Sequence, residues 1–211
     1  MVSDRDKVQI YLSPHLDDVV LSCGGRIWQQ THSGVSVRII TVFAGAPESV
    51  QQLSPFAREL HARWGAPREA VRTRRREDCA ALAVLGAGAV HWDLQDCIYR
   101  VTADGIAAYP DEEALWGPIH PADTSLIRRL RDRIRELTAG RAGRLYVPLA
   151  AGGHVDHRFV RRAAEEAGIG LVYFEDFPYA QDVESVATAT EGGAWQARLI
   201  PLSGEALSAK I

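Results

Sequence analysis

The chain has 211 residues, of which 46% are hydrophobic, so it fits a single domain with a continuous core over residues 1–211. Its formal net charge of −3 gives no overall attraction to nucleic acid or to anionic lipid, and neither partner is expected. The N-terminus lacks an apolar signal region, and no stretch approaches the roughly 18 apolar residues of a membrane span, which predicts a cytoplasmic protein without membrane contact.

The N-terminal part of the chain has the pattern of a β-α-β unit. Residues 8–12 read Val-Gln-Ile-Tyr-Leu, which predicts a buried strand, and apolar residues at helical spacing predict a helix at 19–31. The β-branched segment 35–43 predicts a second buried strand, which a loop at 45–47 ends.

Helical patterns dominate the next forty or so residues. Ser54 and Pro55 are typical of an N-cap and a first-turn proline, and a long helix is predicted from Arg68 to Leu85, ended by Gly86. A short strand is predicted at 89–92, and it leads to Asp93 at the expected rim of the sheet.

Residues 100–122 contain three prolines and two glycines among scattered aromatics, a composition that predicts a long irregular loop. Long loops inside compact domains are usually functional or disordered. Because Tyr109, Trp116 and His120 lie in this segment, we expect an ordered lid or the wall of a pocket.

The second half of the chain alternates again between helical and strand patterns. The expected elements are a helix capped by Asp123 or Thr124 that runs to 137 and is ended by Gly140 and Gly143, then a strand at 144–147, a helix at 157–167, and strands at 169–174 and 195–200. This alternation predicts an α/β fold with a Rossmann-like, mostly parallel sheet flanked by helices.

Two polar clusters follow predicted strands. The first reads Ser-Pro-His-Leu-Asp-Asp at 13–18, and the second reads Gly-Gly-His-Val-Asp-His at 152–157. Ligands of open α/β sheets bind at the carboxyl ends of the strands, so we expect these two clusters to meet in loops at that rim.

The two clusters offer nitrogen and oxygen ligands but no thiolate, a set that suits a catalytic zinc with one open coordination position. Consecutive side chains of a turn point in different directions, so one of Asp17 and Asp18 can hold metal while the other acts as general base. The pair His154 and His157 allows a similar division between a metal ligand and a donor to an oxyanion.

Other readings of these clusters remain open at this point. An Asp-Asp pair after a strand also occurs in magnesium-dependent phosphoacceptor domains, and an aspartate before a helix is often only an N-cap. The first of these readings expects a lysine in a late loop, whereas the only lysines are Lys7 and Lys210. A non-catalytic sugar-binding module is a further alternative, although such a module has no use for Asp17 as a base.

The remaining histidines and the cysteines suggest no second site. His32, His61, His91 and His120 lack a carboxylate-rich motif, and we expect them to have surface or packing roles. Cys23, Cys79 and Cys97 have no C-x-x-C spacing, so three buried or partly buried thiols are expected.

The two clusters resemble the motifs of the zinc-dependent N-acetylglucosaminylphosphatidylinositol deacetylases, the LmbE-like or PIG-L-like family. That family has an apolar strand followed by His-Pro-Asp-Asp-Glu and, much later, His-x-Asp-His. The resemblance covers nearly the whole chain, because it includes His15 to Val19, Gly24-Gly25, the Arg-x-x-Glu pattern of Arg74 and Glu77 with Leu85-Gly86, Asp96, His154 to His157, and the stretch from Glu175 to Tyr179.

The resemblance implies a role for each matching residue. His15, Asp18 and His157 would bind Zn²⁺, Asp17 would be the general base that deprotonates a zinc-activated water, and His154 would stabilise the tetrahedral intermediate. Asp156 would orient a histidine. Arg74 and Asp96 would contact sugar hydroxyls, although Arg74 fits equally well a pairing with Glu77 on its own helix.

The implied activity is that of a zinc-dependent N-deacetylase, an amidohydrolase that releases acetate from an N-acetylated amino sugar or sugar-containing small molecule. Another amide, such as that of a thiol-sugar conjugate, is the alternative substrate. Two positions depart from the family pattern, since Leu16 replaces its proline and Val19 its glutamate. These two replacements bear on the position of the loop and on the substrate class. They do not bear on metal binding, because neither residue is a proposed zinc ligand.

Overall fold

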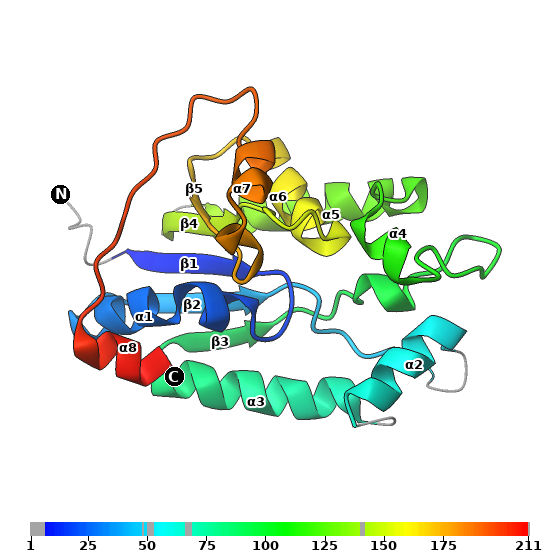
Figure 1. Cartoon of the computed structure of the whole chain (residues 1–211), viewed down its shortest axis with the longest axis horizontal. Helices are drawn as coiled ribbons and strands as arrows, with labels where there is room; N and C mark the ends of the chain where they lie inside the picture. Colours follow the sequence, from blue (N-terminus) through cyan, green and yellow to red (C-terminus); the bar gives the residue numbers. More distant parts are fainter. Residues whose placement is uncertain (1–6, 48, 50–52, 66–68, 140–141, 211) are drawn as a thin grey trace.

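The structure, a computed structural model, describes residues 7–47, 49, 53–65, 69–139 and 142–210. Its centre is a five-stranded sheet with the order β3-β2-β1-β4-β5, in which every strand pair is parallel (Figure 1). The strands are β1 (Val8–Ser13), β2 (Val37–Thr41), β3 (Gly88–His91), β4 (Ala142–Pro148) and β5 (Leu171–Phe174). The predicted Rossmann-like parallel sheet is confirmed.

Helices cover both faces of this sheet (Figure 1). The helices are α1 (Asp18–His32), α2 (Pro55–Arg63), α3 (Ala70–Val84), α4 (Glu112–Trp116), α5 (Thr124–Thr138), α6 (Val155–Ala167), α7 (Val183–Ala189) and α8 (Gly204–Lys210). Short 3-10 turns occur at Cys97–Tyr99, Pro121–Asp123 and Tyr179–Gln181. None of the helices in the described part of the chain is long and apolar enough to cross a membrane.

The buried strands place alternate side chains on opposite faces of the sheet. Ile10 and Leu12 of β1 belong to the core under α5 and α6. Tyr11, between them, belongs to the core under α1 and α3, where its ring stacks on Tyr146 of β4 with the centroids 4.1 Å apart. Both faces are therefore apolar, which explains why these strands read as nearly continuous hydrophobic runs.

The strand order creates a switch point between β1 and β4. The chain leaves β1 for α1 on one face of the sheet and leaves β4 for α6 on the other face. The loops after these two strands therefore diverge at the carboxyl rim, which is where ligands of such sheets bind. Both polar clusters of the sequence lie in this crevice.

Most predicted elements are confirmed, with small shifts in their ends. Ser54 caps α2, because its Oγ accepts a hydrogen bond of 3.1 Å from the amide of Ala57. The expected start of the long helix at Arg68 and the expected stop at Gly140 lie outside the described residues. Thr124 begins α5, but the side chain of Asp123 makes no capping bond to it.

Three predictions on the periphery are wrong. Residues 195–200 form no strand, since they run over the surface without pairing to the sheet, and Leu199 is 94% exposed. The segment 100–122 is not wholly irregular, since it holds the short helix α4, which Asp111 caps through the amide of Ala114. Cys79 is exposed, in contrast to Cys23 and Cys97.

The C-terminal helices α7 and α8 were not predicted from the sequence. Helix α8 packs against α1 (Figure 1). The segment leading into α8 also lies close to α1, because a Cβ atom at Gly25 would lie 2.7 Å from a methyl carbon of Leu202. Gly25 thus allows the C-terminal segment to approach the helix closely.

Candidate active site

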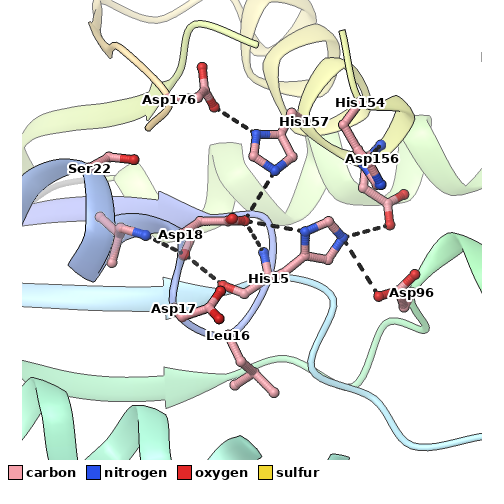
Figure 2. Close-up of polar contacts among 12 residues, drawn as sticks. His15, Leu16, Asp17, Asp18, Ser22, Asp96, His154, Asp156, His157 and Asp176 are labelled. Carbon is pink, nitrogen blue, oxygen red and sulfur yellow. Dashed lines mark hydrogen bonds and ion pairs between the residues drawn. The ribbon is translucent and has the colours of Figure 1, made fainter. Parts of the chain in front are cut away.

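The loop after β1 is held by short local hydrogen bonds. Ser13 Oγ donates to the carbonyl oxygen of His15 at 2.7 Å and accepts from the amide of Val19 at 3.2 Å. Asp18, the first residue of α1, accepts the amide hydrogen of His15 at 2.7 Å. The turn therefore directs the His15 ring and the Asp18 carboxylate toward each other (Figure 2).

Asp17 occupies the N-cap position of α1 but does not act as a cap. Its side chain makes no capping hydrogen bond, and its backbone is left-handed with a φ of 100°. This conformation is costly for a residue with a side chain, and such strain gathers at functional sites. The exposed carboxylate lies 3.4 Å from Arg74 Nη2, and the same guanidinium donates to the carbonyl oxygen of Leu16 at 3.0 Å.

The loop after β4 also contains a left-handed residue, Ala150, with a φ of 60°. Gly152 follows it, and a Cβ atom at this position would lie 2.2 Å from the ring of Tyr179. The Gly-Gly pair, for which the sequence offered no structural purpose, therefore lets an aromatic ring lie directly against the turn.

We expected the second cluster to lie in a loop, but it lies at the start of a helix. His154 is the N-cap of α6, because its Nδ1 accepts the amide hydrogen of Asp156 at 3.2 Å. Asp156 and His157 lie in the first helical turn, and both are buried. The helix fixes their backbone, so the directions of these side chains are well defined.

The three proposed metal ligands meet at one carboxylate oxygen (Figure 2). Asp18 Oδ2 lies 3.3 Å from His15 Nδ1 and 3.2 Å from His157 Nε2. A tetrahedral zinc with bonds of about 2.0–2.1 Å holds its ligand atoms about 3.3 Å apart. The two distances therefore match the edges of a zinc site, and the donor set is that of a catalytic zinc.

The outer nitrogen of each of these histidines faces a buried carboxylate (Figure 2). His15 Nε2 lies 3.0 Å from Asp156 Oδ2, and His157 Nδ1 lies 2.6 Å from Asp176 Oδ1. Histidines that ligate a metal almost always donate their second N–H to a carboxylate, a carbonyl or water. The same arrangement occurs twice here, which leaves the inner nitrogens as the ones available to a metal.

Asp176 is a site residue that the sequence analysis did not assign. It lies two residues after β5, and its Oδ2 also accepts the amide hydrogen of Ala151 at 3.2 Å. Two signals were available, namely a carboxylate close to the end of a predicted strand and the family-like stretch from Glu175 to Tyr179. Which histidine it meets depends on the packing of β5 beside β4, and local sequence does not contain that information.

The groups that meet at Asp18 shift one another's pKa values strongly. Burial would lower the pKa of His157, but Asp18 and Asp176 raise it to about 9. Burial would likewise lower the pKa of His15, but Asp96, Asp156 and Asp18 raise it well above its ordinary value. Burial acts to raise the pKa of Asp18, and the two histidines hold it well below its usual range. The site thus favours a cation between these three groups.

His154 has the opposite electrostatic character. Burial and the neighbouring His15 lower the pKa of His154 to about 4, so its ring is neutral at neutral pH. Because Nδ1 accepts a backbone N–H, the proton of the neutral ring is on Nε2. His15, His154 and His157 can each place one ring nitrogen within 4.8 Å of the others, so His154 is close enough to donate a hydrogen bond beside the metal position.

Arg74 and Asp96, the expected substrate contacts, border the same place. They line a small cleft together with His15, Leu16, Phe43, Gly45, Trp64, Val71 and Tyr99. Arg74 contacts Asp17 and Leu16, and among the described residues it forms no ion pair with Glu77. The structure therefore brings all eight residues predicted for the site to one crevice.

The loop at 100–122 contributes only in part to the pocket wall. The ring of Trp116 packs edge-on against His154 with the centroids 5.3 Å apart, and it is 43% exposed. Tyr109 is buried and therefore does not line the pocket, contrary to expectation. His120 packs against Tyr109 and accepts the amide hydrogen of Ala122 at 3.2 Å.

The other histidines have packing roles, as expected. His32 stacks on Trp28 with the ring centroids 3.8 Å apart, and His61 contacts the hydroxyl of Tyr99 at 2.6 Å. His91 has a carboxylate partner that the sequence did not reveal, since its Nε2 lies 2.7 Å from Asp78 Oδ2.

Comparison with protein families shows one match over most of the chain. Residues 10–168 match the family described as PIG-L: GlcNAc-PI de-N-acetylase. The matched region contains both polar clusters and the strands that precede them.

Curated relatives and solved structures agree with this match. Two relatives are 2'-N-acetylparomamine deacetylases: that of Niallia circulans is 27% identical over 82% of this chain and 67% of its own length, and that of Streptomyces fradiae is 29% identical over 84% and 59%. The structure of the zinc-inhibited form of teicoplanin deacetylase Orf2 superposes with a TM-score of 0.79 at 31% identity, covering 96% of this chain and 80% of that one.

Proposed function

Because this chain belongs to the PIG-L family of GlcNAc-PI de-N-acetylases, we propose that it is a zinc-dependent hydrolase that removes the N-acetyl group from an amino sugar or a sugar-containing small molecule. The observation that carries the proposal is the meeting of His15, Asp18 and His157, with Asp18 Oδ2 at 3.3 and 3.2 Å from the two histidines. The proposal treats residues 1–211 as one deacetylase domain, which the single shared sheet supports.

His15, Asp18 and His157 would hold the zinc through two ring nitrogens and one carboxylate oxygen. When bound, the metal polarises the acyl carbonyl and acidifies a water molecule. Asp156 and Asp176 keep the two rings in place through their outer nitrogens. The protein thus supplies three ligands and leaves a further coordination position open.

Asp17 is the general base of the proposed reaction. Partial withdrawal from water raises the pKa of Asp17 above its ordinary value, although Arg74 opposes the rise. A raised pKa brings the carboxylate closer to the pH at which it must accept a proton. The oxygen of the deprotonated water forms a bond to the acetyl carbon, and Asp17 holds the proton that the leaving nitrogen requires.

His154 stabilises the negative charge on the carbonyl oxygen during this attack. Its neutral ring carries the N–H on Nε2, and a neutral donor serves the oxyanion without having to lose a proton first. When the C–N bond breaks, the nitrogen takes the proton and the products are acetate and a free amine.

The substrate class follows from the relatives and from the cleft. The names of the relatives describe deacetylases of 2'-N-acetylparomamine and of teicoplanin, both sugar-containing molecules. Arg74 and Asp96 place a cation and an anion beside His15, a combination that suits hydroxyl groups of a sugar. We therefore propose an N-acetylated sugar or glycoconjugate as the small-molecule partner.

The function is tested with protein purified in the absence of chelators. Its metal content is measured by elemental analysis, and release of free amine is followed with 2'-N-acetylparomamine and with a simple N-acetylglucosaminide. We expect about one zinc per chain and amine release that stops on chelation and returns with added zinc. If amine were released only from a thiol-sugar amide, the substrate would be such a conjugate and not an N-acetylated sugar. If no amide released amine, the proposal would be overturned.

Arg74 is expected to act mainly in substrate binding. Replacing it by methionine should raise KM about tenfold or more, because a hydrogen bond to a charged donor is lost, whereas Arg74→Lys should keep part of the effect. Steady-state kinetics measures both variants. Arg76→Met is the matched control, because Arg76 lies on the same helix, is exposed and, among the described residues, donates a hydrogen bond to Thr73 alone, at 3.2 Å. A KM for Arg74→Met equal to that of the control would remove Arg74 from the substrate site.

A further inference from the structure

A buried arginine lies behind the candidate metal site. Arg100 follows the turn Cys97–Tyr99, and its side chain is 7% exposed. Its Nη2 donates to Asp156 Oδ1, and its Nε lies 3.3 Å from Asp123 Oδ2. One guanidinium therefore contacts two buried carboxylates that belong to different parts of the chain.

Both carboxylate oxygens of Asp156 have partners. Oδ1 accepts from Arg100, while Oδ2 accepts the amide hydrogen of Cys97 at 3.0 Å and lies 3.0 Å from His15 Nε2. Asp156 is fully buried, and a buried carboxylate remains ionised only where cations and hydrogen-bond donors compensate for lost water. Arg100 therefore compensates this carboxylate for the lost water and holds it turned toward His15.

Arg100 is also held by Asp123 and by two aromatic rings, on the side away from Asp156. Asp123 accepts the hydroxyl hydrogen of Tyr109 at 2.7 Å, and the same hydroxyl accepts the amide hydrogen of His120 at 2.8 Å. The guanidinium carbon lies 5.0 Å from the centre of the Phe43 ring and 5.2 Å from that of Tyr109. These contacts leave the arginine little freedom to turn, so its position is set by the loop at 100–123.

We propose that Arg100 is a positioning residue that sets the metal affinity of the site by fixing Asp156 against His15. The inference rests on the proposed zinc function. Arg100 touches neither the metal position nor the cleft, since its contacts are with Asp156, Asp123 and the surrounding rings. Its effect on zinc must pass through Asp156, which in turn holds the outer nitrogen of His15.

The inference is tested by measuring zinc affinity with competing chelators in Arg100→Lys and Arg100→Met. Loss of a group that orients a ligand typically weakens metal binding by about 10- to 100-fold. We expect this range for the methionine variant and a smaller loss for the lysine variant, which keeps a charge but cannot serve both carboxylates. Thermal unfolding of the metal-free proteins shows whether each variant is folded.

Arg135→Met is the control, because Arg135 is an exposed arginine of α5 whose contacts in the described part of the chain are with Asp132 and with two carbonyl oxygens of α6. Its Nε donates to the carbonyl oxygen of Ala167 and its Nη2 to that of Glu166, each at 3.0 Å. This variant should bind zinc as tightly as the parent. If Arg100→Lys folds and also binds zinc as tightly as the parent, the inference is overturned.

A double variant separates positioning from general destabilisation. If Arg100 acts only through Asp156, then adding Arg100→Met to Asp156→Asn should cause no further loss of zinc affinity. Independent losses that add would contradict the inference. Because the parent's zinc content and amine release are measured separately, a parent that binds no zinc defeats the proposed function, whereas unaffected Arg100 variants of a zinc-binding parent defeat this inference alone.

Discussion

Asp17→Asn is expected to abolish turnover while zinc remains bound. The substitution removes the base, and general acid–base catalysis contributes about 10²- to 10⁴-fold to rates, so kcat should fall by that range. Zinc should stay, because Asp17 contacts Arg74 and has no contact with His15 or His157. Initial rates of amine release and elemental analysis of the same preparation measure the two effects.

The control for this variant is Asp93→Asn. Asp93 is also an aspartate at the rim of the sheet, its side chain is 83% exposed, and its ion pair is with Arg75 at 3.4 Å. We expect this variant to keep full activity. Full activity in Asp17→Asn as well would remove Asp17 from the mechanism, and loss of zinc would mean that it is a ligand and not a base.

His157→Ala is expected to lose the metal. It removes the nitrogen that lies 3.2 Å from Asp18 and also leaves Asp176 without its partner, so both a ligand and the support behind it disappear. Elemental analysis should find zinc in the parent and almost none in the variant. His32→Ala is the control, since that ring stacks on Trp28 at the far end of α1.

Asp176→Asn gives a graded form of the same experiment. The ligand remains, but the carboxylate that faces His157 Nδ1 becomes an amide, so zinc affinity should fall by about 10- to 100-fold and not vanish. Equal zinc binding by His157→Ala and the parent would show that the ligand assignment is wrong.

The location of the site was predictable because its two polar clusters lie in the segments that follow two strands. The apolar runs before His15 and His154 define β1 and β4, and parallel strands bring their carboxyl ends to one rim. The roles of the individual residues came from family resemblance. The left-handed backbone of Asp17 was not predicted, because a tight turn imposes it and the residue type gives no signal.

The supporting residues were missed because their partners are distant in the sequence. Asp156 and Arg100 are 56 residues apart, and His157 and Asp176 are 19 apart. Only the packing of α6 against the loop and β5 brings them together. The error at residues 195–200 has a related cause, since a segment forms a strand only where the fold pairs it with another strand, and this segment pairs with none of the described strands.

The central claim is that zinc held by this site enables the release of acetate from an acetamido sugar. Its most direct test is the rate of amine release by the parent protein after complete chelation and again after one equivalent of zinc is restored, with His157→Ala treated in parallel. We expect no release after chelation, recovery in the parent and no recovery in the variant. Undiminished release from the zinc-free parent, or equal recovery in His157→Ala, would contradict it.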